Sequence, residues 1–380
     1  MKNKILTGLL LVLIGGWGSL SAQSAGSNYA RQVNTLIGTK GVGLTSGYLY
    51  PGATYPYGMV QFTPSYFSKR SGFVINQLSG GGCEHMGNFP TFPVKGKLKM
   101  SPDNILNYRI NISEEKGHAG YYEAKVQEDI HAKLTVTERT GMASYEYPAD
   151  QQYGTVIIGG GISATPIEQA AIVITAPNKC EGYAEGGNFC GLRTPYKVYF
   201  VAEFDTDALE SGTWKRDELK PNTTFAEGEY SGVYFTFDVN KKKNIQYKIG
   251  VSYVSVENAR ENLKAENTGW DFLQIQNQAE SKWNHYLGKI EVEGTNPDRT
   301  TQFYTHLYRS FIHPNVCSDV NGEYMGADFR VHKSRSKHYT SFSNWDTYRT
   351  QIQLLSILDP EVASDIVISH QLFAEEAGGA

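Results

Sequence analysis

The chain changes its hydrophobic period near residue 257. Before that point, short runs of alternating or continuous apolar residues recur between turn clusters, at residues 130–136, 155–158, 172–175, 196–204, 230–239 and 247–256. Runs of this length, without helical periods between them, predict an antiparallel β-sandwich and disfavour a doubly wound sheet. We therefore expect residues 23–256 to form an N-terminal β-sandwich domain.

After residue 257, apolar residues recur every three or four positions, which places them on one stripe of a helix. The first stripe consists of Phe272, Ile275, Ala279, Trp283 and Leu287. A second helix is predicted to begin at Pro297 and Asp298 and to end before Pro314. One face of it carries Phe303, Leu307 and Phe311.

Two further helices are predicted near the C-terminus. One follows Asp346 and carries Leu354, Leu355 and Leu358. Asp359 before Pro360 is typical of an N-cap followed by the first helical turn, and opens a helix whose inward residues are Val362, Ile366 and Phe373.

So few amphipathic helices cannot bury their stripes as a complete all-helical domain. We expect linker helices at residues 257–295, and at residues 296–380 the beginning of a helical domain that continues beyond Ala380. The alternative is that these helices pack on the sandwich and the protein is complete.

The N-terminus has the order of regions of a secretory signal peptide. Lys2 and Lys4 precede an apolar run at residues 5–13 and small polar residues at 19–23, which predicts a signal peptide at residues 1–22. An uncleaved anchor is disfavoured, because a bilayer span needs about 20 apolar residues. We expect a periplasmic or secreted protein with no membrane span after signal removal.

Composition narrows the class further. The chain has 380 residues, of which 40% are hydrophobic and 19% charged, and its formal net charge is −4. This composition indicates a globular protein, and the missing basic excess excludes nucleic acid as a partner. The 25 tyrosines and five tryptophans suit strand-rich exported folds and sugar-stacking surfaces alike.

Four cysteines are present in a chain bound for an oxidising compartment. Cys180 and Cys190 flank a glycine-rich stretch, so a local hairpin disulfide between them is predicted. Cys83 and Cys317 are expected to be buried as small hydrophobic residues. The cysteine spacings fit no zinc motif.

Three segments are candidate sites. The first comprises residues 33–39, 50–54 and 56–61, whose glycine and proline density demands a specific loop trace. Residues 75–90 contain three consecutive glycines, and Glu84, His85 and Asn88 supply an acceptor, a donor and an amide for hydroxyl groups. The alternative for this second segment is a structural loop in which Glu84 and His85 are solvated.

The third segment, residues 341–349, contains Trp345, Asp346 and Arg349. An indole face beside a carboxylate and a guanidinium can hold a pyranose by stacking and hydrogen bonding. The alternative is a helix start in which Asp346 caps the backbone and pairs with Arg349. Residue types alone favour this alternative slightly.

At these segments the chain resembles glycoside hydrolase family 92, a family of exo-acting α-mannosidases. The resemblance rests on ordered segments that run from about Tyr29 to the end: VNTLIGT, PGATYPYGMVQFTP, LSGGGCEHMGNFP, GNFCG, KIGVSYVSVENARENL, FYTHLYRSFIHPN, SDVNGEYMG and SNWDTYRTQIQLLSILDP. It implies a β-sandwich, linker helices and a truncated (α/α)6 barrel, and calcium-dependent hydrolysis with inversion. The acid, the base and the calcium ligands are expected beyond Ala380, so no catalytic or metal-binding residue is assigned within the chain.

The resemblance also implies substrate-binding residues. Trp345 and Asp346 match the motif at the pocket for the terminal mannose, which reverses the preference for the helix-start interpretation; Arg349 is included with them. The glycine-rich loop matches the leaving-group side and implicates Cys83, Glu84, His85 and Met86, with Asn88 as a further candidate.

The chain departs from the family pattern at this loop. Asn76–Gln77 and Asn88 stand where many members carry an aromatic–histidine pair and an aspartate. The α-1,2 linkage is therefore only the default expectation, and α-1,3, α-1,4, α-1,6 and phosphodiester-linked mannose stay open.

Two other hypotheses remain. The chain could be a carbohydrate-binding module without hydrolytic activity, or a structural half that only supports the barrel. The resemblance favours support over an independent lectin. The expected partners are a mannose-containing glycan and the missing barrel in cis.

Overall fold

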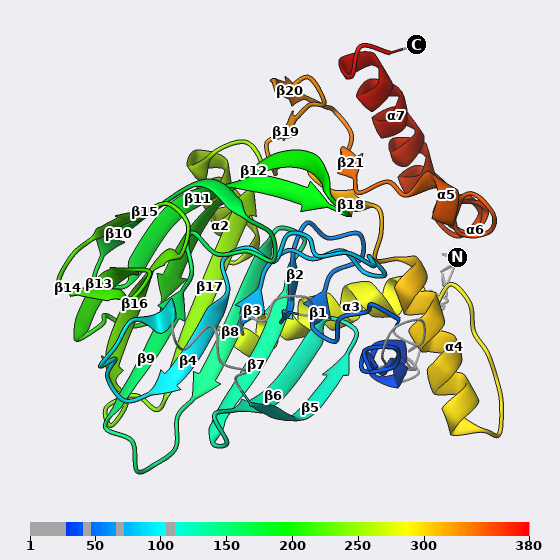
Figure 1. Cartoon of the computed structure of the whole chain (residues 1–380). Coiled ribbons are helices and arrows are strands. Elements are labelled where there is room, and N and C mark those ends of the chain that lie inside the picture. The colour runs from blue at the N-terminus through cyan, green and yellow to red at the C-terminus, as the bar shows by residue number, and fades with distance from the viewer. Residues whose placement is uncertain (1–27, 41–46, 66–71, 104–110, 380) are drawn as a thin grey trace, which may run out of the picture.

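The computed structural model describes residues 28–40, 47–65, 72–103 and 111–379 (Figure 1). Two large antiparallel sheets are followed by helices, so the prediction of an N-terminal two-sheet domain is confirmed. The predicted signal peptide lies outside the described residues. In the described part of the chain, no helix has the length and apolarity needed to cross a membrane.

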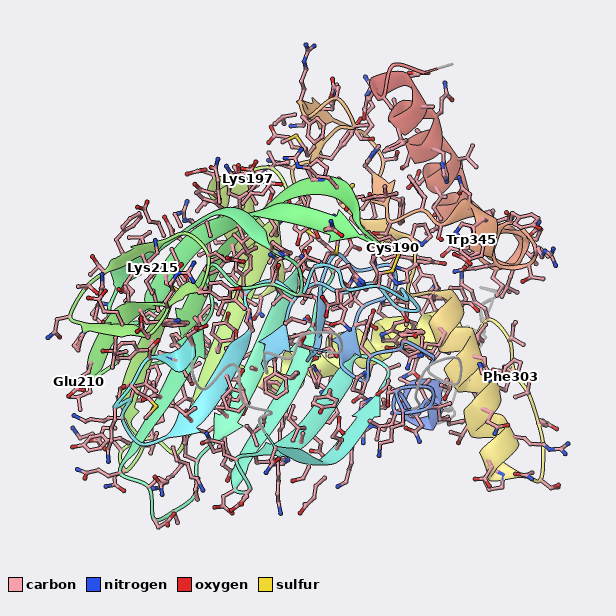
Figure 2. All side chains as sticks on the ribbon, viewed as in Figure 1. Cys190, Lys197, Glu210, Lys215, Phe303 and Trp345 are labelled. Atoms are coloured by element: carbon pink, nitrogen blue, oxygen red, sulfur yellow. A yellow bond between two sulfur atoms is a disulfide. The ribbon has the colours of Figure 1, made fainter. Side chains whose placement is uncertain are left out.

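The first sheet has eight strands in the order β1-β2-β3-β4-β9-β16-β13-β14. In that order their bounds are Ala53–Thr54, Gln61–Pro64, Phe73–Val74, Thr91–Lys95, Tyr153–Ile158, Ser231–Asp238, Glu210–Lys215 and Glu218–Pro221. Exposed side chains such as Glu210 and Lys215 of β13 point away from the sandwich (Figure 2).

The second sheet has nine strands in the order β15-β10-β11-β12-β17-β8-β7-β6-β5. In that order their bounds are Phe225–Glu227, Ile167–Ala176, Lys179–Phe189, Leu192–Phe204, Asn244–Ser252, Thr140–Glu146, Ile130–Val136, Tyr121–Val126 and Ile112–His118. All six predicted runs overlap strands of the two sheets, namely β7, β9, β10, β12, β16 and β17, although the run predicted to end at residue 256 leaves the sheet after Ser252.

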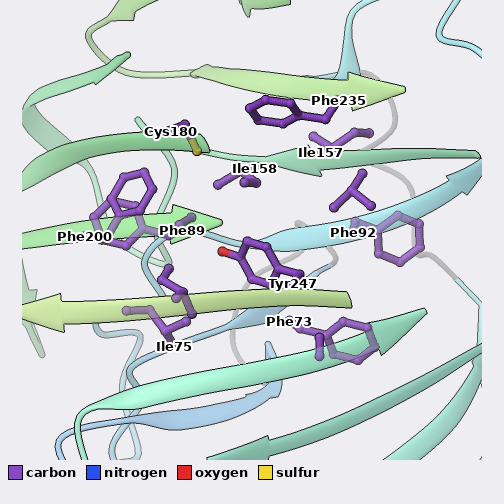
Figure 3. Packing of buried hydrophobic residues seen from close by; sticks show 14 of the residues in the cluster. Phe73, Ile75, Phe89, Phe92, Ile157, Ile158, Cys180, Phe200, Phe235 and Tyr247 are labelled. Atoms are coloured by element: carbon purple, nitrogen blue, oxygen red, sulfur yellow. The ribbon is translucent and has the colours of Figure 1, made fainter. Parts of the chain in front are cut away.

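The main hydrophobic core lies between the two sheets (Figure 3). Phe92 and Phe235 from the first sheet and Phe200 and Tyr247 from the second are fully buried. The ring centroids of Phe89 and Phe200 lie 4.3 Å apart. Strand side chains alternate between faces, so each sheet presents one apolar face to the other.

Strands give way to helices between Ser252 and Val256. The helices are η1 (Tyr29–Gln32), α2 (Val256–Glu266), α3 (Phe272–Leu287), α4 (Pro297–Ser310), α5 (Asn344–Thr347), α6 (Gln351–Leu358) and α7 (Pro360–Glu376). Two short ribbons lie between α4 and α5: β18 (Asn315–Val316) pairs with β21 (Tyr339–Thr340), and β19 (Glu323–Met325) pairs with β20 (Val331–Lys333).

The predicted helical stripes are mostly confirmed. In α3, Trp283 is fully buried and its indole N–H donates to the carbonyl oxygen of Thr54 at 2.7 Å. Asp359 caps α7 by accepting from the backbone N–H of Val362. Phe373 is a correction: it is 50% exposed, because α7 projects away from the sandwich and this end of the helix is held through Glu376, which accepts from the Tyr324 hydroxyl and the Ala327 backbone N–H (Figure 1).

The first glycine- and proline-rich segment is a joint between the sandwich and the helices. The guanidinium of Arg309 on α4 donates to the carbonyl oxygens of Thr35 at 2.7 Å and of Tyr50 at 3.2 Å. The hydroxyls of Thr54 and Tyr308 lie 2.7 Å apart in a buried contact. These bonds explain the loop trace that the composition demands, and they assign this segment to the scaffold.

A buried carboxylate makes a second joint. Asp319 accepts hydrogen bonds from the Ser252 hydroxyl at 2.6 Å, from the Asn258 amide at 2.8 Å and from the Asn262 amide at 2.6 Å. It thereby connects the end of β17, helix α2 and the segment after β18. Burial raises the pKa of Asp319, and the three donors act in the opposite direction.

Candidate functional site

Two buried asparagines, Asn76 and Asn88, join the two ends of the glycine-rich loop by hydrogen bonds. The Asn76 side-chain amide donates to Oδ1 of Asn88 at 3.0 Å, and the Asn88 backbone N–H donates to Oδ1 of Asn76 at 2.8 Å. The Tyr196 hydroxyl of β12 donates to the same Asn88 oxygen at 2.6 Å. Asn88 is fully buried, so the structure uses this candidate binding residue to shape the loop.

His85 holds the loop from inside. Its Nε2 accepts from the Leu78 backbone N–H at 2.8 Å, which requires a neutral ring with its proton on Nδ1. Nδ1 lies 2.6 Å from the carbonyl oxygen of Cys83 and donates to it. Burial lowers the pKa of His85, which favours this neutral form. The predicted role as a hydroxyl donor therefore conflicts with the hydrogen bonds that both nitrogens already make.

A second histidine, His313, accepts a hydrogen bond from the backbone amide of Ser79, the residue after Leu78. His313 follows α4, and its Nε2 accepts from the Ser79 backbone N–H at 2.9 Å. Its Nδ1 lies 2.7 Å from Oδ1 of Asn315, whose own amide donates to the carbonyl oxygen of Gly58 at 2.9 Å. Burial lowers the pKa of His313 to about 4. Two neutral imidazoles thus accept from two successive amides of the loop.

The disulfide joins Cys83 to Cys190, across 107 residues of sequence, and this corrects the prediction that Cys180 pairs with Cys190. Residues Lys179–Phe189 form one continuous strand instead of a hairpin turn. At about 3.3 Å per residue, this strand separates Cys180 from Cys190 by about 30 Å. The turn lies at Cys190 and Gly191, where φ is 53° and 84°, and Cys190 marks this end of the hairpin (Figure 2).

The other cysteines are thiols. Cys180 is free and fully buried in the sandwich core, and Cys317 is free and 6% exposed. The expectation of a buried small residue is therefore confirmed for Cys317 and wrong for Cys83, which the disulfide engages.

The third candidate segment lies on the surface. Trp345 on α5 is 81% exposed (Figure 2). Asp346 and Arg349 are exposed as well. The N-cap position of α5 is Ser343, whose hydroxyl donates to the Asp346 carboxylate. Arg349 donates to the Tyr348 hydroxyl at 2.7 Å, and the described residues contain no ion pair between Asp346 and Arg349. The helix-start alternative, with Asp346 as the cap, does not describe this segment.

One residue connects the second and third segments. The side-chain amide of Gln351, at the start of α6, donates to the carbonyl oxygens of His313 at 3.1 Å and Ser310 at 3.0 Å. Because the His313 ring also accepts from Ser79, the glycine-rich loop and the start of α6 share one support. The structure thus links the two predicted binding segments through a residue outside both.

Six of the candidate residues are at least partly accessible. Glu84, Trp345, Asp346 and Arg349 are exposed, and Cys83 and Met86 are partly exposed. Two carboxylates, a guanidinium and an indole can accept from hydroxyls, donate to them and stack on a C–H face. Each of these groups is of a type that contacts polyhydroxylated ligands.

Two family models match the chain: the glycosyl hydrolase family 92 N-terminal domain over residues 32–252, and the glycosyl hydrolase family 92 catalytic domain over residues 258–380. The chain belongs to glycoside hydrolase family 92. Its strand-to-helix transition lies between the two matched regions of this family 92 chain.

Solved structures have the same fold. A family 92 α-mannosidase from Bacteroides thetaiotaomicron matches with a TM-score of 0.81 and 25% identity, over 92% of this chain and 49% of that protein. An inverting mannosidase of the family from the same species has a TM-score of 0.79 and 24% identity, over 92% and 49%. An uncharacterized secreted glycosidase of Arthroderma benhamiae is 26% identical over 363 residues, 84% of this chain and 45% of that protein. The family 92 chain therefore spans about half the length of these relatives.

Sequence reasoning missed three residues that shape the site: Tyr196, His313 and Gln351. Each acts on a segment far away in sequence, so no local pattern reveals it. A local signal did exist for Cys180, because Cys180, Gly182 and Ala184 alternate with larger polar residues, which is typical of the inward face of a strand.

Proposed function

We propose that this chain is the N-terminal portion of an exo-α-mannosidase that acts on mannose-containing glycans, with α-1,2-linked mannose as the default substrate. The observation that carries the proposal is the match to both family 92 domains over residues 32–252 and 258–380. Its support is the similar fold of a family 92 α-mannosidase at 25% identity.

In this proposal the exposed segment of α5 holds the terminal sugar. Trp345 stacks on a C–H face of the mannose, the Asp346 carboxylate accepts from a hydroxyl, and the Arg349 guanidinium donates to another. Glu84 and Met86 face the leaving group from the glycine-rich loop. His85, His313 and the Cys83–Cys190 disulfide fix the position of that loop.

The reaction itself needs further groups. Inversion requires a carboxylic acid for the leaving oxygen and a carboxylate for the attacking water, about 6.5–9.5 Å apart. When bound, calcium takes about six to eight oxygen ligands and supplies electrostatic stabilisation. The described residues contain no group of three or more His, Cys, Asp or Glu side chains that could hold a metal ion. We assign the catalytic acid, the catalytic base and the calcium ligands to the part of the longer relatives that this chain does not cover.

The exposed apolar residues of the last helices support a continuation of the barrel in cis. Ile357 on α6 is 78% exposed, and Val367 and Phe373 on α7 are 63% and 50% exposed. Large exposed apolar side chains on neighbouring elements mark an interaction surface. We assign this surface to the remaining barrel helices, and we propose export through the predicted signal peptide.

Mannose release from a panel of α-mannobioses tests the proposal. This chain is compared with the longest continuous reading frame, each with calcium and with chelator. We expect release by the long form alone, abolished by chelator, and turnover by the 380-residue chain would contradict the assigned incompleteness. In the long form, Trp345→Ala should raise KM at least tenfold, whereas Phe329→Ala, a change at an exposed aromatic residue elsewhere, should not.

The same assay separates the alternatives. Saturable mannoside binding without turnover in any form favours a carbohydrate-binding module. Neither binding nor turnover favours a purely structural half.

A further inference from the structure

The outer face of the nine-stranded sheet carries a groove that none of the candidate site residues reaches. It encloses about 680 Å³ and lies between strands β6, β7, β8 and β17 and the beginning of α3; its lining includes Tyr121, Lys133, Ser144, Asn244, Gln246 and Trp270. This volume lies within the range of about 300–1,000 Å³ that is usual for small-molecule sites.

The floor of the groove is a polar row across three strands. Lys133 of β7 is paired in register with Ser144 of β8, which is paired with Gln246 of β17. The Ser144 hydroxyl donates to Oδ1 of Asn244 at 2.7 Å, which leaves the Asn244 amide N–H groups for another acceptor. The side chains that alternate with this row point into the sandwich core.

Two floor groups have unused hydrogen-bonding capacity. Oδ1 of Asn244 is engaged, but Oε1 of Gln246 is buried and has no hydrogen-bond partner among the residues that the structure describes. The Lys133 ammonium makes no hydrogen bond or ion pair with another residue of the described ranges. A buried carbonyl oxygen without a donor destabilises the protein, so a ligand hydroxyl that donates to it would form the missing hydrogen bond.

The wall of the groove is a fixed aromatic side chain. Trp270 is partly exposed, and its ring lies over the Lys248 ammonium, 4.4 Å from Nζ to the ring centroid. Lys248 is 5% exposed and donates to the carbonyl oxygen of Asn267 at 3.0 Å, so the cation supporting the indole is itself held. A stacking surface that is ordered before binding loses little entropy when a ligand arrives.

The charged side chains that line the groove have no net charge. Lys133 supplies one positive charge and Asp271 one negative charge, and the Asp271 carboxylate already caps α3 through the Gln274 N–H at 3.0 Å. A phosphate or an acidic ligand finds no cation cluster here. An aromatic wall above a row of amide, hydroxyl and ammonium groups matches a neutral polyol with one apolar face.

We propose that this groove is an accessory site for a neutral hexopyranose residue of a glycan, stacked on Trp270 and hydrogen-bonded to Gln246, Asn244 and Lys133. The choice of mannose as the sugar rests on the proposed function. A site of this kind retains a branched or polymeric glycan on the enzyme while another of its termini is processed.

Binding of α-mannobiose to the 380-residue chain, followed by calorimetry and saturation-transfer NMR, tests the site. We expect saturable binding with a dissociation constant of about 1 mM, weakened about tenfold by Trp270→Ala. Gln246→Leu and Lys133→Ala each remove one polar group of the floor and leave the indole in place. If Trp270→Ala does not fold, loss of mannobiose binding in these two variants tests the site instead. Phe225→Ala, at an exposed aromatic residue on β15, is the matched control and should bind normally.

Trp345→Ala distinguishes this site from the α5 segment. Binding that survives Trp345→Ala and is lost in the floor variants supports the groove. Binding that is lost in Trp345→Ala and kept in the groove variants overturns it, as does the absence of saturation up to about 10 mM. Mannose release by the long form is measured separately, so failure of the groove and failure of the mannosidase proposal give different results.

Discussion

The backbone N–H of Ser79 donates to Nε2 of His313 at 2.9 Å, across a sequence separation of 234 residues. This bond attaches the glycine-rich loop of the sandwich to the segment that follows α4. His313 is also bound through its carbonyl oxygen by Gln351. The relationship makes His313 a support for both candidate binding segments and leads to the first prediction.

His313→Ala should lower the free energy of unfolding by about 1–3 kcal/mol, because it leaves the Ser79 N–H without its acceptor. It should also increase protease cleavage within residues 75–90. Urea unfolding and limited proteolysis measure the two effects. His306→Ala, a change at an exposed histidine of α4, is the control, and equal behaviour of both variants would contradict the assigned support.

Acid should destabilise the fold through His313. Its pKa is about 4 in the folded chain, below the ordinary value of 6.5, so between these values the unfolded chain binds a proton that the folded chain does not. The contribution of His313 to stability is therefore complete above pH 6.5 and falls as the pH drops towards 4, by about 3 kcal/mol. Urea titrations at pH 7 and 4.5 measure this change. His313→Gln keeps an acceptor but does not titrate, so its pH dependence should be smaller, and an unchanged dependence would refute the assignment.

The disulfide assignment predicts a thiol count. In denaturant without reductant, two of the four cysteines, Cys180 and Cys317, should react with a thiol reagent, and all four after reduction. Peptide mapping should recover Cys83 linked to Cys190. Replacing both by serine should cost about 2–4 kcal/mol, because the bond closes a long loop. A peptide linking Cys180 to Cys190 would show that β11 is not the continuous strand described here.

Asp319→Asn should destabilise the joint between the sandwich and the helices. The substituted amide can accept through only one oxygen, whereas the carboxylate receives three donors from Ser252, Asn258 and Asn262. We expect a loss of about 2 kcal/mol in unfolding experiments. Asp150→Asn, at an exposed position of the sandwich, gives the baseline for the same chemical change. A loss no larger than this baseline would mean that the joint is held by other contacts.

Much of the fold could be predicted because its signals are local. The alternation of residues 130–136 and the three-to-four-residue period from Phe272 to Leu287 each reflect the geometry of one element. The cap of α7 at Asp359 is equally local. Phe373 shows the limit, because its periodicity matches an inward position although its side chain is half exposed.

The site was less predictable because the residues that hold its loops in place are distant from those loops in sequence. His85 and Asn88 have the residue types of sugar ligands, yet burial and long-range partners such as Tyr196 determine their roles. The pairing of Cys83 with Cys190 depends on how β11 and β12 run, which cysteine spacing alone does not reveal. Trp345, by contrast, is as accessible as a stacking residue must be.

The disulfide between Cys83 and Cys190 separates two steps of folding: packing of the sandwich core and covalent attachment of the glycine-rich loop. The sandwich core holds its cysteine, Cys180, as a thiol, so its packing needs no oxidation. The glycine-rich loop does need it, because its covalent attachment to the hairpin forms only when both thiols are oxidised. In a reducing compartment the chain would therefore fold without this covalent bond, and its glycine-rich loop would be held only by hydrogen bonds such as those of His85 and His313.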